Sequence, residues 1–405
     1  MKKVGELALG LVTSIGGFLE IGSLTTSAQA GAAFEYQLIW VLLLGTIGLG
    51  VLMEGAGRLA AVGRRTFADQ LRERFGVRFF CVPLLAVLVV SLLVLASEIG
   101  GVGFALQLAT NIDARWWALP VAFAAWLLLW RHSFTLVEQG TAGLGMVALI
   151  FAVAAVATHP QWSHVARAFA PSLPSHQPAH YWYLAVSVLG AAISPYLFIF
   201  YSSGVVEDKW TPDDVGLNRI VAVVGNLFGG LLCICVLVVA AQVLAPHTAT
   251  VDRPEQLPLL LSTPFGRTGF VFFALTLGVT CFGATVEIAL TIAYSLAQGF
   301  GWQWSANEEP GRNARFASAY SFSLLLAGAL MATGIGVLTL TNLSMVITAA
   351  SLPLTVVPLM VLLNDRKVMS HHANGWVSNA MLGVFALLSV VLLVAALPLQ
   401  LMGGG

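Results

Sequence analysis

Long apolar segments separated by short polar stretches run through the whole chain. The apolar runs between polar and turn-forming residues predict eleven helices. Ten of them reach the roughly 20 residues that a helix needs to cross a hydrocarbon layer about 30 Å thick. The expected ranges are 4–31, 36–60, 79–110, 116–130, 135–157, 181–205, 217–245, 268–299, 315–337, 341–363 and 375–400. The pattern therefore predicts an all-α polytopic membrane protein with 11 transmembrane helices.

Composition agrees with a membrane protein and narrows the possible partners. Of 405 residues, 58% are hydrophobic and 9% are charged, whereas a soluble domain carries about 25% charged residues. Lysine and arginine (19) balance aspartate and glutamate (19), so no charge excess points to nucleic acid. The expected partners are the lipid bilayer and a transported ion or small solute. All four cysteines lie in apolar segments, which favours packing roles over disulfides.

The basic residues predict an orientation. If the N-terminus is cytoplasmic, 15 of the 19 lysines and arginines lie on the inner side. The outer side then holds only Arg115, Arg167, Arg253 and Arg267. This positive-inside bias predicts a bacterial-type cytoplasmic (inner) membrane protein with an external C-terminus.

Two of the expected spans contain residues that interrupt helices. The first holds Gly16-Gly17 and then Glu20-Ile21-Gly22-Ser23, and the sixth holds Ser194-Pro195-Tyr196 after Gly190. Such residues are costly in the membrane unless their backbone lines a cavity. The two spans cross in opposite directions, and matched breaks in inverted halves are typical of a transporter's midplane binding site. The alternative is a pair of kinked helices packed through small residues.

Acidic residues deep in the spans point to a positively charged guest. Glu20, Glu98 and Glu287 lie within apolar segments, whereas Glu54 is expected to pair with Arg58 four residues later. Three carboxylates without a deep lysine or arginine favour cations. Threonine and serine stripes in 268–299 and 341–363 indicate either hydrogen bonds between helices or a hydrated pathway.

The interrupted first span also carries a family resemblance. The stretch from Gly16 to Val41 resembles the first helix and following loop of the NRAMP family of divalent-metal transporters. The resemblance continues through Arg72-Glu73-Arg74-Phe75, Leu217-Asn218-Arg219, Gln298-Gly299-Phe300 and Val357-Pro358-Leu359. It implies a LeuT-like fold within a single transmembrane domain, residues 1–405. Two inverted five-helix repeats, about 4–157 and about 181–363, would be followed by one extra helix, about 375–400.

The resemblance also implies a binding site, with substitutions. Family members have Asp-Pro-Gly-Asn and Met-Pro-His where this chain has Glu20-Ile21-Gly22-Ser23 and Ser194-Pro195-Tyr196. Glu20, Ser23, Ser194 and the carbonyl of Ala191 would then hold the metal, and Gly22, Tyr196 and Glu287 would complete the substrate site. Glu98 matches one acid of the family's proton-linked pair and would give coupling or electrostatic support. Gly101 occupies the position of the second acid.

These ligands predict the kind of cation. An all-oxygen set suits hard ions such as Mg²⁺ or Mn²⁺. We therefore expect a secondary-active transporter that imports a hard divalent cation by alternating access, with weak or no proton coupling and no cofactor. The alternative is a transporter of a small organic solute, amino acid or amine-like, on the same scaffold. An enzyme is not expected, because the chain contains no HExxH or GxSxG arrangement.

Overall fold

Helices and their connecting loops account for the part of the chain that the structure describes. The structure is a computed structural model, and it describes residues 19–131, 146–247 and 251–403. No β-strand occurs among these residues. The all-α prediction is therefore confirmed.

The helices fall into three groups by length. The long helices are α3 (Ile39–Gly63), α4 (Phe67–Thr110), α5 (Ala114–Arg131), α11 (Val215–Val243), α12 (Leu259–Phe300), α13 (Ala314–Ala332) and α17 (Trp376–Gly403). The shorter helices are α2 (Ile21–Phe34), α7 (Ile150–Ala157), α8 (Trp162–Arg167), α9 (Pro178–Ala192), α10 (Pro195–Glu207), α14 (Val337–Ser351), α15 (Pro353–Leu363) and α16 (Arg366–Met369). Short 3₁₀ turns are η1 (Met146–Leu149), η2 (Pro212–Asp214), η3 (Ala245–His247), η4 (Pro254–Gln256) and η5 (Ser370–His372).

Most of the expected membrane-spanning segments correspond to long apolar helices in the described part of the chain. Within the described ranges, eight helical segments are long and apolar enough to cross a membrane, and 146–157 forms a shorter apolar helix. The helices α2 and α5 match two further expected spans, although residues 1–18 and 132–145 lie outside the described part. The count of eleven stays a prediction.

Two long helices contain a glycine that redirects the chain. Gly76 in α4 has φ 79° and ψ 161°, and Gly266 in α12 has φ 60° and ψ −141°. Glycine adopts positive φ without the steric cost that a Cβ imposes. The membrane spans expected to start at 79 and 268 begin just after these glycines. The helical turns before Gly76 and Gly266 therefore form separate helical segments that run in a different direction.

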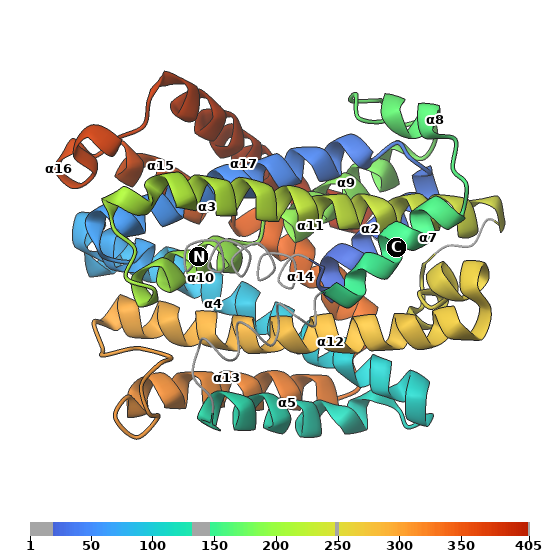
Figure 1. The fold of residues 1–405 in the computed structure, drawn as a ribbon, viewed down its shortest axis with the longest axis horizontal. Helices are drawn as coiled ribbons and strands as arrows, with labels where there is room; N and C mark the ends of the chain where they lie inside the picture. Colours follow the sequence, from blue (N-terminus) through green and yellow to red (C-terminus); the bar gives the residue numbers. More distant parts are fainter. Residues whose placement is uncertain (1–18, 132–145, 248–250, 404–405) are drawn as a thin grey trace.

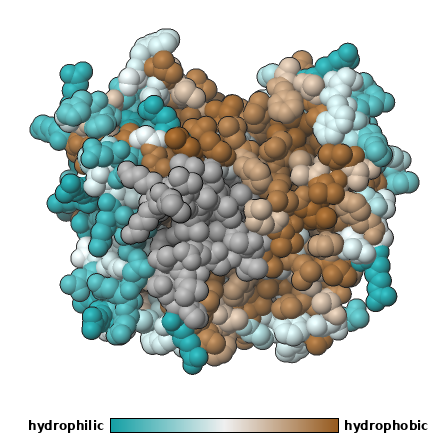
Figure 2. Space-filling view, viewed as in Figure 1, coloured by the Kyte–Doolittle hydropathy of each residue, from teal (hydrophilic) through white to brown (hydrophobic). Residues whose placement is uncertain are grey.

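The helices pack in pairs around a buried centre. Figure 1 shows α5 and α13 side by side along the lower edge, with α12 above them, and α2 and α14 near the middle. The pairs α4–α12 and α3–α11 make extensive contacts, and α2 packs against α9, α11, α14 and α4. Figure 2 shows hydrophobic residues across the middle of this face and hydrophilic residues toward its left and right edges. An apolar belt between polar ends matches a protein surrounded by lipid.

The expected pair on α3 is present. Arg58 Nε lies 2.9 Å from Glu54 Oε1, and Arg58 also donates hydrogen bonds to the carbonyl of His372 (2.5 Å) and to Asn374 Oδ1 (2.7 Å). The local pair is therefore confirmed, and it also attaches α3 to the segment between α16 and α17. Glu54 is held by this structural contact rather than by the binding site.

Candidate functional site

Both predicted helix interruptions are present, and helix resumes close to each of them; Gly16 and Gly17 of the first lie outside the described residues. Glu20 has extended backbone angles (φ −92°, ψ 174°), and α2 begins directly after it. Ile193 (φ −118°, ψ 66°) and Ser194 (φ −83°, ψ 128°) separate α9 from α10. Among the described residues, the breaks expected near 20–23 and 191–196 are therefore located at Glu20 and at Ile193–Ser194.

Local hydrogen bonds and a proline explain where the helices start and end beside each break. The N–H of Leu24 donates to the carbonyl of Glu20 at 3.0 Å, which places Gly22 and Ser23 in the first helical turn. Ala191 lies in the last turn of α9, and Pro195 opens α10. Proline is well suited to the first helical position because it has no N–H to leave unpaired.

Glu20 lies at the centre of the site. Its side chain is 1% exposed. The hydroxyl of Tyr196, the second residue of α10, donates a hydrogen bond to Glu20 Oε2. The other oxygen, Oε1, has no hydrogen-bond partner within the described part of the chain. A buried carboxylate oxygen without a donor is costly, so this atom marks a position where a cation would be stabilised.

Ser23 and Glu98 hold the start of α2. The N–H of Glu20 donates to Ser23 Oγ at 3.3 Å. The N–H of Ile21 donates to both carboxylate oxygens of Glu98, at 3.2 and 3.4 Å. The first N–H groups of a helix have no partner inside the helix, and its N-terminus attracts negative charge. Glu98, which comes from α4, is therefore brought to the site as a partner of the helix that follows Glu20.

Ser194 and Ala191 lie together at the second break. The Ser194 hydroxyl donates to the carbonyl of Gly190 at 3.2 Å and approaches that of Ala191 at 3.5 Å. Ser194 is fully buried, and Ala191 is 4% exposed. No hydrogen bond among the described residues joins either of them to Glu20, so Tyr196 provides the direct link between the two breaks.

Glu287 lies at the margin of the site. It is half-buried on α12 and acts electrostatically on the Tyr196 hydroxyl. Its carbonyl accepts a hydrogen bond from Thr291 at 2.9 Å, and Thr280 similarly donates to Thr276. The hydroxyls along α14 also return to carbonyls of their own helix. These hydroxyls therefore donate to carbonyl acceptors within their own helices, while their oxygens can still accept.

Met345 is a site residue that the sequence did not reveal. It is fully buried on α14. A Cβ built on Gly22 would lie 2.8 Å from Met345 Sδ and 3.2 Å from Glu20 Oε1, so both atoms border the small space beside Gly22. The expected set of ligands was all oxygen, and the structure places a thioether beside the same space. A sulfur directly after Ser344 in the polar stripe is the one signal that could have indicated it.

A second network of hydrogen bonds surrounds the C-terminal end of α10, the helix that carries Tyr196. Glu207, the last residue of α10, accepts hydrogen bonds from Tyr294 Oη (3.2 Å), Ser305 Oγ (2.9 Å), the Ala306 N–H (2.8 Å) and Asn307 Nδ2 (3.2 Å). These donors fasten the loop after α12 to α10. The orientation predicted from the basic residues places this loop on the cytoplasmic side.

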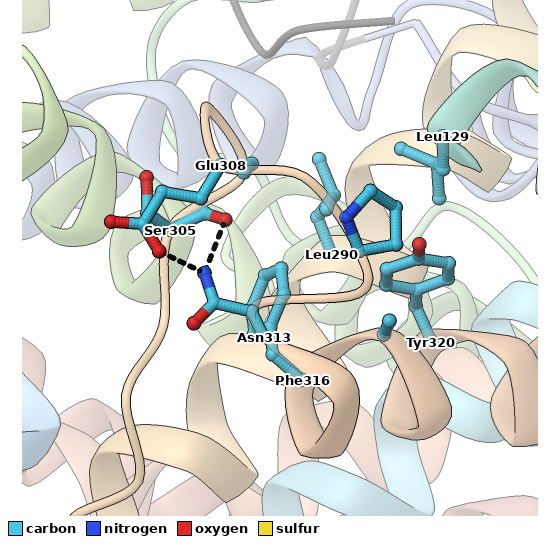
Figure 3. A pocket seen from close by; sticks show the side chains of 10 residues that line it. Leu129, Leu290, Ser305, Glu308, Asn313, Phe316 and Tyr320 are labelled. Atoms are coloured by element: carbon cyan, nitrogen blue, oxygen red, sulfur yellow. Dashed lines mark hydrogen bonds between the residues drawn. The ribbon is translucent and has the colours of Figure 1, made fainter. Parts of the chain in front are cut away.

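The same loop is braced near a small cavity. Asn313 Nδ2 donates to the carbonyl of Ser305 at 3.3 Å and to Glu308 Oε2 at 2.9 Å, as the dashed lines in Figure 3 show. Tyr320 lines the same cavity of about 20 Å³, which is room for about one water molecule. The loop is therefore held at both of its ends.

The sequence matches one protein family over almost its whole length. A family model described as "Natural resistance-associated macrophage protein-like" (Nramp) matches residues 10–398. The "Divalent metal cation transporter MntH 1" of Pseudomonas aeruginosa is 27% identical over 401 residues, covering 94% of this chain and 88% of that protein. The "Divalent metal cation transporter MntH" of Latilactobacillus sakei is 30% identical over 210 residues, covering 50% of this chain and 45% of that protein.

Solved structures of similar shape support the fold. A manganese transporter of Eremococcus coleocola aligns with TM-score 0.76 at 18% identity, covering 98% of this chain and 86% of that one. Mhp1, a nucleobase-cation-symport-1 family transporter, aligns with TM-score 0.66 at 14% identity, covering 98% and 90%. The LeuT-like arrangement expected from the sequence is therefore confirmed at the level of the fold.

Proposed function

The chain belongs to the Nramp family, and on this premise we propose that it carries a divalent cation through the membrane past Glu20. It is a multi-pass membrane transporter and not an enzyme. The observation that carries the proposal is that no donor among the described residues reaches Oε1 of the buried Glu20, which lies at the first helix break. The cation is cargo, and we propose no resident cofactor. Relatives named as divalent metal cation transporters support this assignment.

We assign the metal contacts to residues at the two breaks. Glu20 Oε1 would supply the charge, with Ser23, Ser194 and the carbonyl of Ala191 as neutral oxygen ligands. Gly22 leaves room beside the carboxylate, and Tyr196 would position Glu20 by its hydrogen bond. Glu287 and Glu98 would add negative potential from α12 and α4.

Between the two hard ions that the sequence suggests, the site favours Mn²⁺ over Mg²⁺. Mg²⁺ releases its water reluctantly and prefers octahedral oxygen ligands. A thioether is a softer ligand that suits transition metals better than Mg²⁺. The position of Met345 Sδ beside Gly22 therefore supports Mn²⁺ as the preferred cargo.

Transport would proceed by alternating access. Glu20, Ser194 and Tyr196 are at most 1% exposed, so this conformation gives a cation no open route to them. Movement of α2 and α10 relative to α4 and α12 would open the site on one side at a time. We propose inward transport, with the N-terminus in the cytoplasm and weak or no proton coupling, because Gly101 and Tyr196 replace two family positions that titrate.

Transport of an organic solute is less favoured by the geometry. A carboxylate-bearing solute would need free N–H groups at a helix start. The N–H of Ile21 already donates to Glu98, and Glu20 lies beside it. Two buried acids at this helix end would repel an anionic group.

Uptake into proteoliposomes tests the proposal. Purified wild-type protein should take up Mn²⁺, and Glu20→Ala and Glu20→Gln should lose most of this uptake while unfolding at similar temperatures. Glu309→Gln is the matched control, because Glu309 is an exposed carboxylate paired only weakly with Arg312 (3.9 Å). Unchanged Mn²⁺ uptake in both Glu20 variants would overturn the role of Glu20. Uptake of amino acids or amines in place of metals would overturn the cation assignment.

A further inference from the structure

An apolar groove lies on the outside of the helix bundle, away from the cation site. It has a volume of about 540 Å³ and runs along α13 where this helix meets α4 and α12. Its apolar lining comes from all three helices, namely Leu88, Leu92, Ile292, Leu296, Phe322 and Leu326. Phe322 is 72% exposed and Leu326 is 56% exposed, so the groove opens to the surroundings of the bundle.

One end of the groove is positively charged. Arg315 lies in the first turn of α13 and is exposed. Its guanidinium carbon lies 5.7 Å from the centre of the Trp302 ring, and both residues line the groove. Arg74, by contrast, lies 3.0 Å from a carboxylate oxygen of Asp365. Among the described residues, no carboxylate lies within ion-pair distance of Arg315, so its charge is available to an external anion.

The dimensions of the groove match one leaflet of a bilayer. Arg315 and Leu326 are 11 positions apart on α13, which corresponds to about 16 Å along a helix. Half of a hydrocarbon layer about 30 Å thick is about 15 Å. With the Arg315 guanidinium and the Trp302 indole at a membrane interface, the groove would reach the depth where an acyl chain ends.

We propose that this groove is a binding site for an anionic phospholipid. The phosphate would bind Arg315, and one acyl chain would lie along Leu88, Leu92 and Phe322. Basic sites between helices on the cytoplasmic side are suited to anionic head groups, and the basic residues place Arg315 on that side. An apolar helix from a second copy would cover the leucines but would leave the arginine without a matching charge.

Lipid binding to the purified full-length protein tests this site. Native mass spectrometry would count phosphatidylglycerol and phosphatidylcholine bound to wild type, Arg315→Gln and Arg312→Gln. Arg312 is the matched control, because it is an exposed arginine three positions away that does not line the groove. We expect wild type to prefer phosphatidylglycerol and Arg315→Gln to bind it about fivefold more weakly, since one basic residue near a membrane contributes about 1 kcal/mol.

A second variant tests the apolar part of the groove independently of the Arg315 charge. Ala319→Trp would fill the groove and should weaken phosphatidylglycerol binding while Arg315 is unchanged. Its thermal unfolding in phosphatidylcholine shows whether the variant is folded, and Ala319→Leu serves if it is not. The proposal would be overturned if Arg312→Gln and Arg315→Gln lost phosphatidylglycerol binding equally, or if wild type bound both lipids equally. A mass that corresponds to a dimer without bound lipid would also overturn it. Displacement of the lipid by inorganic phosphate alone would overturn the acyl-chain contact.

Discussion

The hydroxyl of Tyr196 donates a hydrogen bond to a carboxylate oxygen of Glu20, although 176 positions separate the two residues in the chain. This contact joins the start of α10 to the start of α2. It also leaves the two oxygens of Glu20 different, because Oε2 has a donor and Oε1 has none among the described residues. In the proposed site, a cation would therefore meet one oxygen of a carboxylate whose orientation is already fixed.

We expect Tyr196→Phe to destabilise the cation-free protein more than the cation-bound protein. Without its donor, the buried carboxylate loses a hydrogen bond to a charged group, which costs about 1–3 kcal/mol. A bound cation would compensate for part of this loss. Thermal unfolding with and without Mn²⁺ should therefore show a larger Mn²⁺-induced rise in Tm for Tyr196→Phe than for wild type.

The control for this variant is Tyr201→Phe on the same helix. Tyr201 donates to Asn218 Oδ1 at 3.0 Å and has no contact with Glu20. Its Mn²⁺-induced rise in Tm should equal that of wild type. A similar rise for all three proteins would show that the Tyr196 hydroxyl does not influence the cation site.

Met345→Leu should reduce the preference for Mn²⁺ over Mg²⁺. The substitution nearly conserves volume but removes the sulfur beside Gly22 and Glu20 Oε1. We expect the ratio of Mn²⁺ to Mg²⁺ affinity to fall about fivefold, which corresponds to roughly 1 kcal/mol. Competition between the two ions in proteoliposome uptake measures this ratio. Met331→Leu, another buried methionine, should leave it unchanged.

Glu207→Ala should increase solvent access at the end of the protein where the loop after α12 is hydrogen-bonded to α10. The substitution removes an acceptor shared by four donors. One hydrogen bond to a charged group contributes about 1.5 kcal/mol or more, so the open state should become at least about tenfold more populated. Cys233, which is fully buried on α11, provides a natural reporter.

The measurement needs a protein with Cys233 as its single cysteine. Water-soluble maleimide should label Cys233 faster in Glu207→Ala than in the unsubstituted background. Asp208→Asn, a change at the neighbouring exposed carboxylate, should not alter the labelling rate. If the rate in Glu207→Ala is also unaltered, the contacts of Glu207 do not control access to the centre of the bundle.

Gly190→Ala should destabilise the packing of α9 on α14. A Cβ at this position would lie 2.1 Å from the carbonyl oxygen of Met345, which is backbone and cannot rotate away. We expect a loss of about 1–3 kcal/mol, as for other overpacked sites. Thermal unfolding measures the loss. Gly216→Ala is the control, because nothing lies within 4 Å of its built Cβ; equal stability of both variants would contradict the close packing.

Features encoded by neighbouring residues were predictable from the sequence. Ser194-Pro195 predicted an interruption because proline favours the first position of a new helix, and α10 begins at Pro195. The pairing of Glu54 with Arg58 followed from helical spacing. The sequence also singled out Glu98 as a carboxylate deep in an apolar run, and the structure places it against the N–H of Ile21.

Features that depend on packing between distant helices were not predictable. The approach of Met345 to Gly22 depends on the close packing of α2 on α14, which sequence spacing does not report. The first break was expected at 20–23, but the hydrogen bond from Leu24 to Glu20 starts the helix earlier than the glycine suggests. The contacts of Glu207 likewise join α10 to a loop about 100 positions away.

The hydrogen bond from the Ile21 N–H to Glu98 couples movement of α2 to the surroundings of the Glu98 carboxylate. If α2 tilts away from α4 in the proposed cycle, Glu98 loses the Ile21 N–H as a donor, and losing a hydrogen bond to a buried carboxylate costs about 1–3 kcal/mol. A loaded carrier would offset this penalty through its cargo, whereas an empty carrier would not. The return of the unloaded carrier should therefore be the slow half of the transport cycle, and abundant cation on the far side should accelerate exchange.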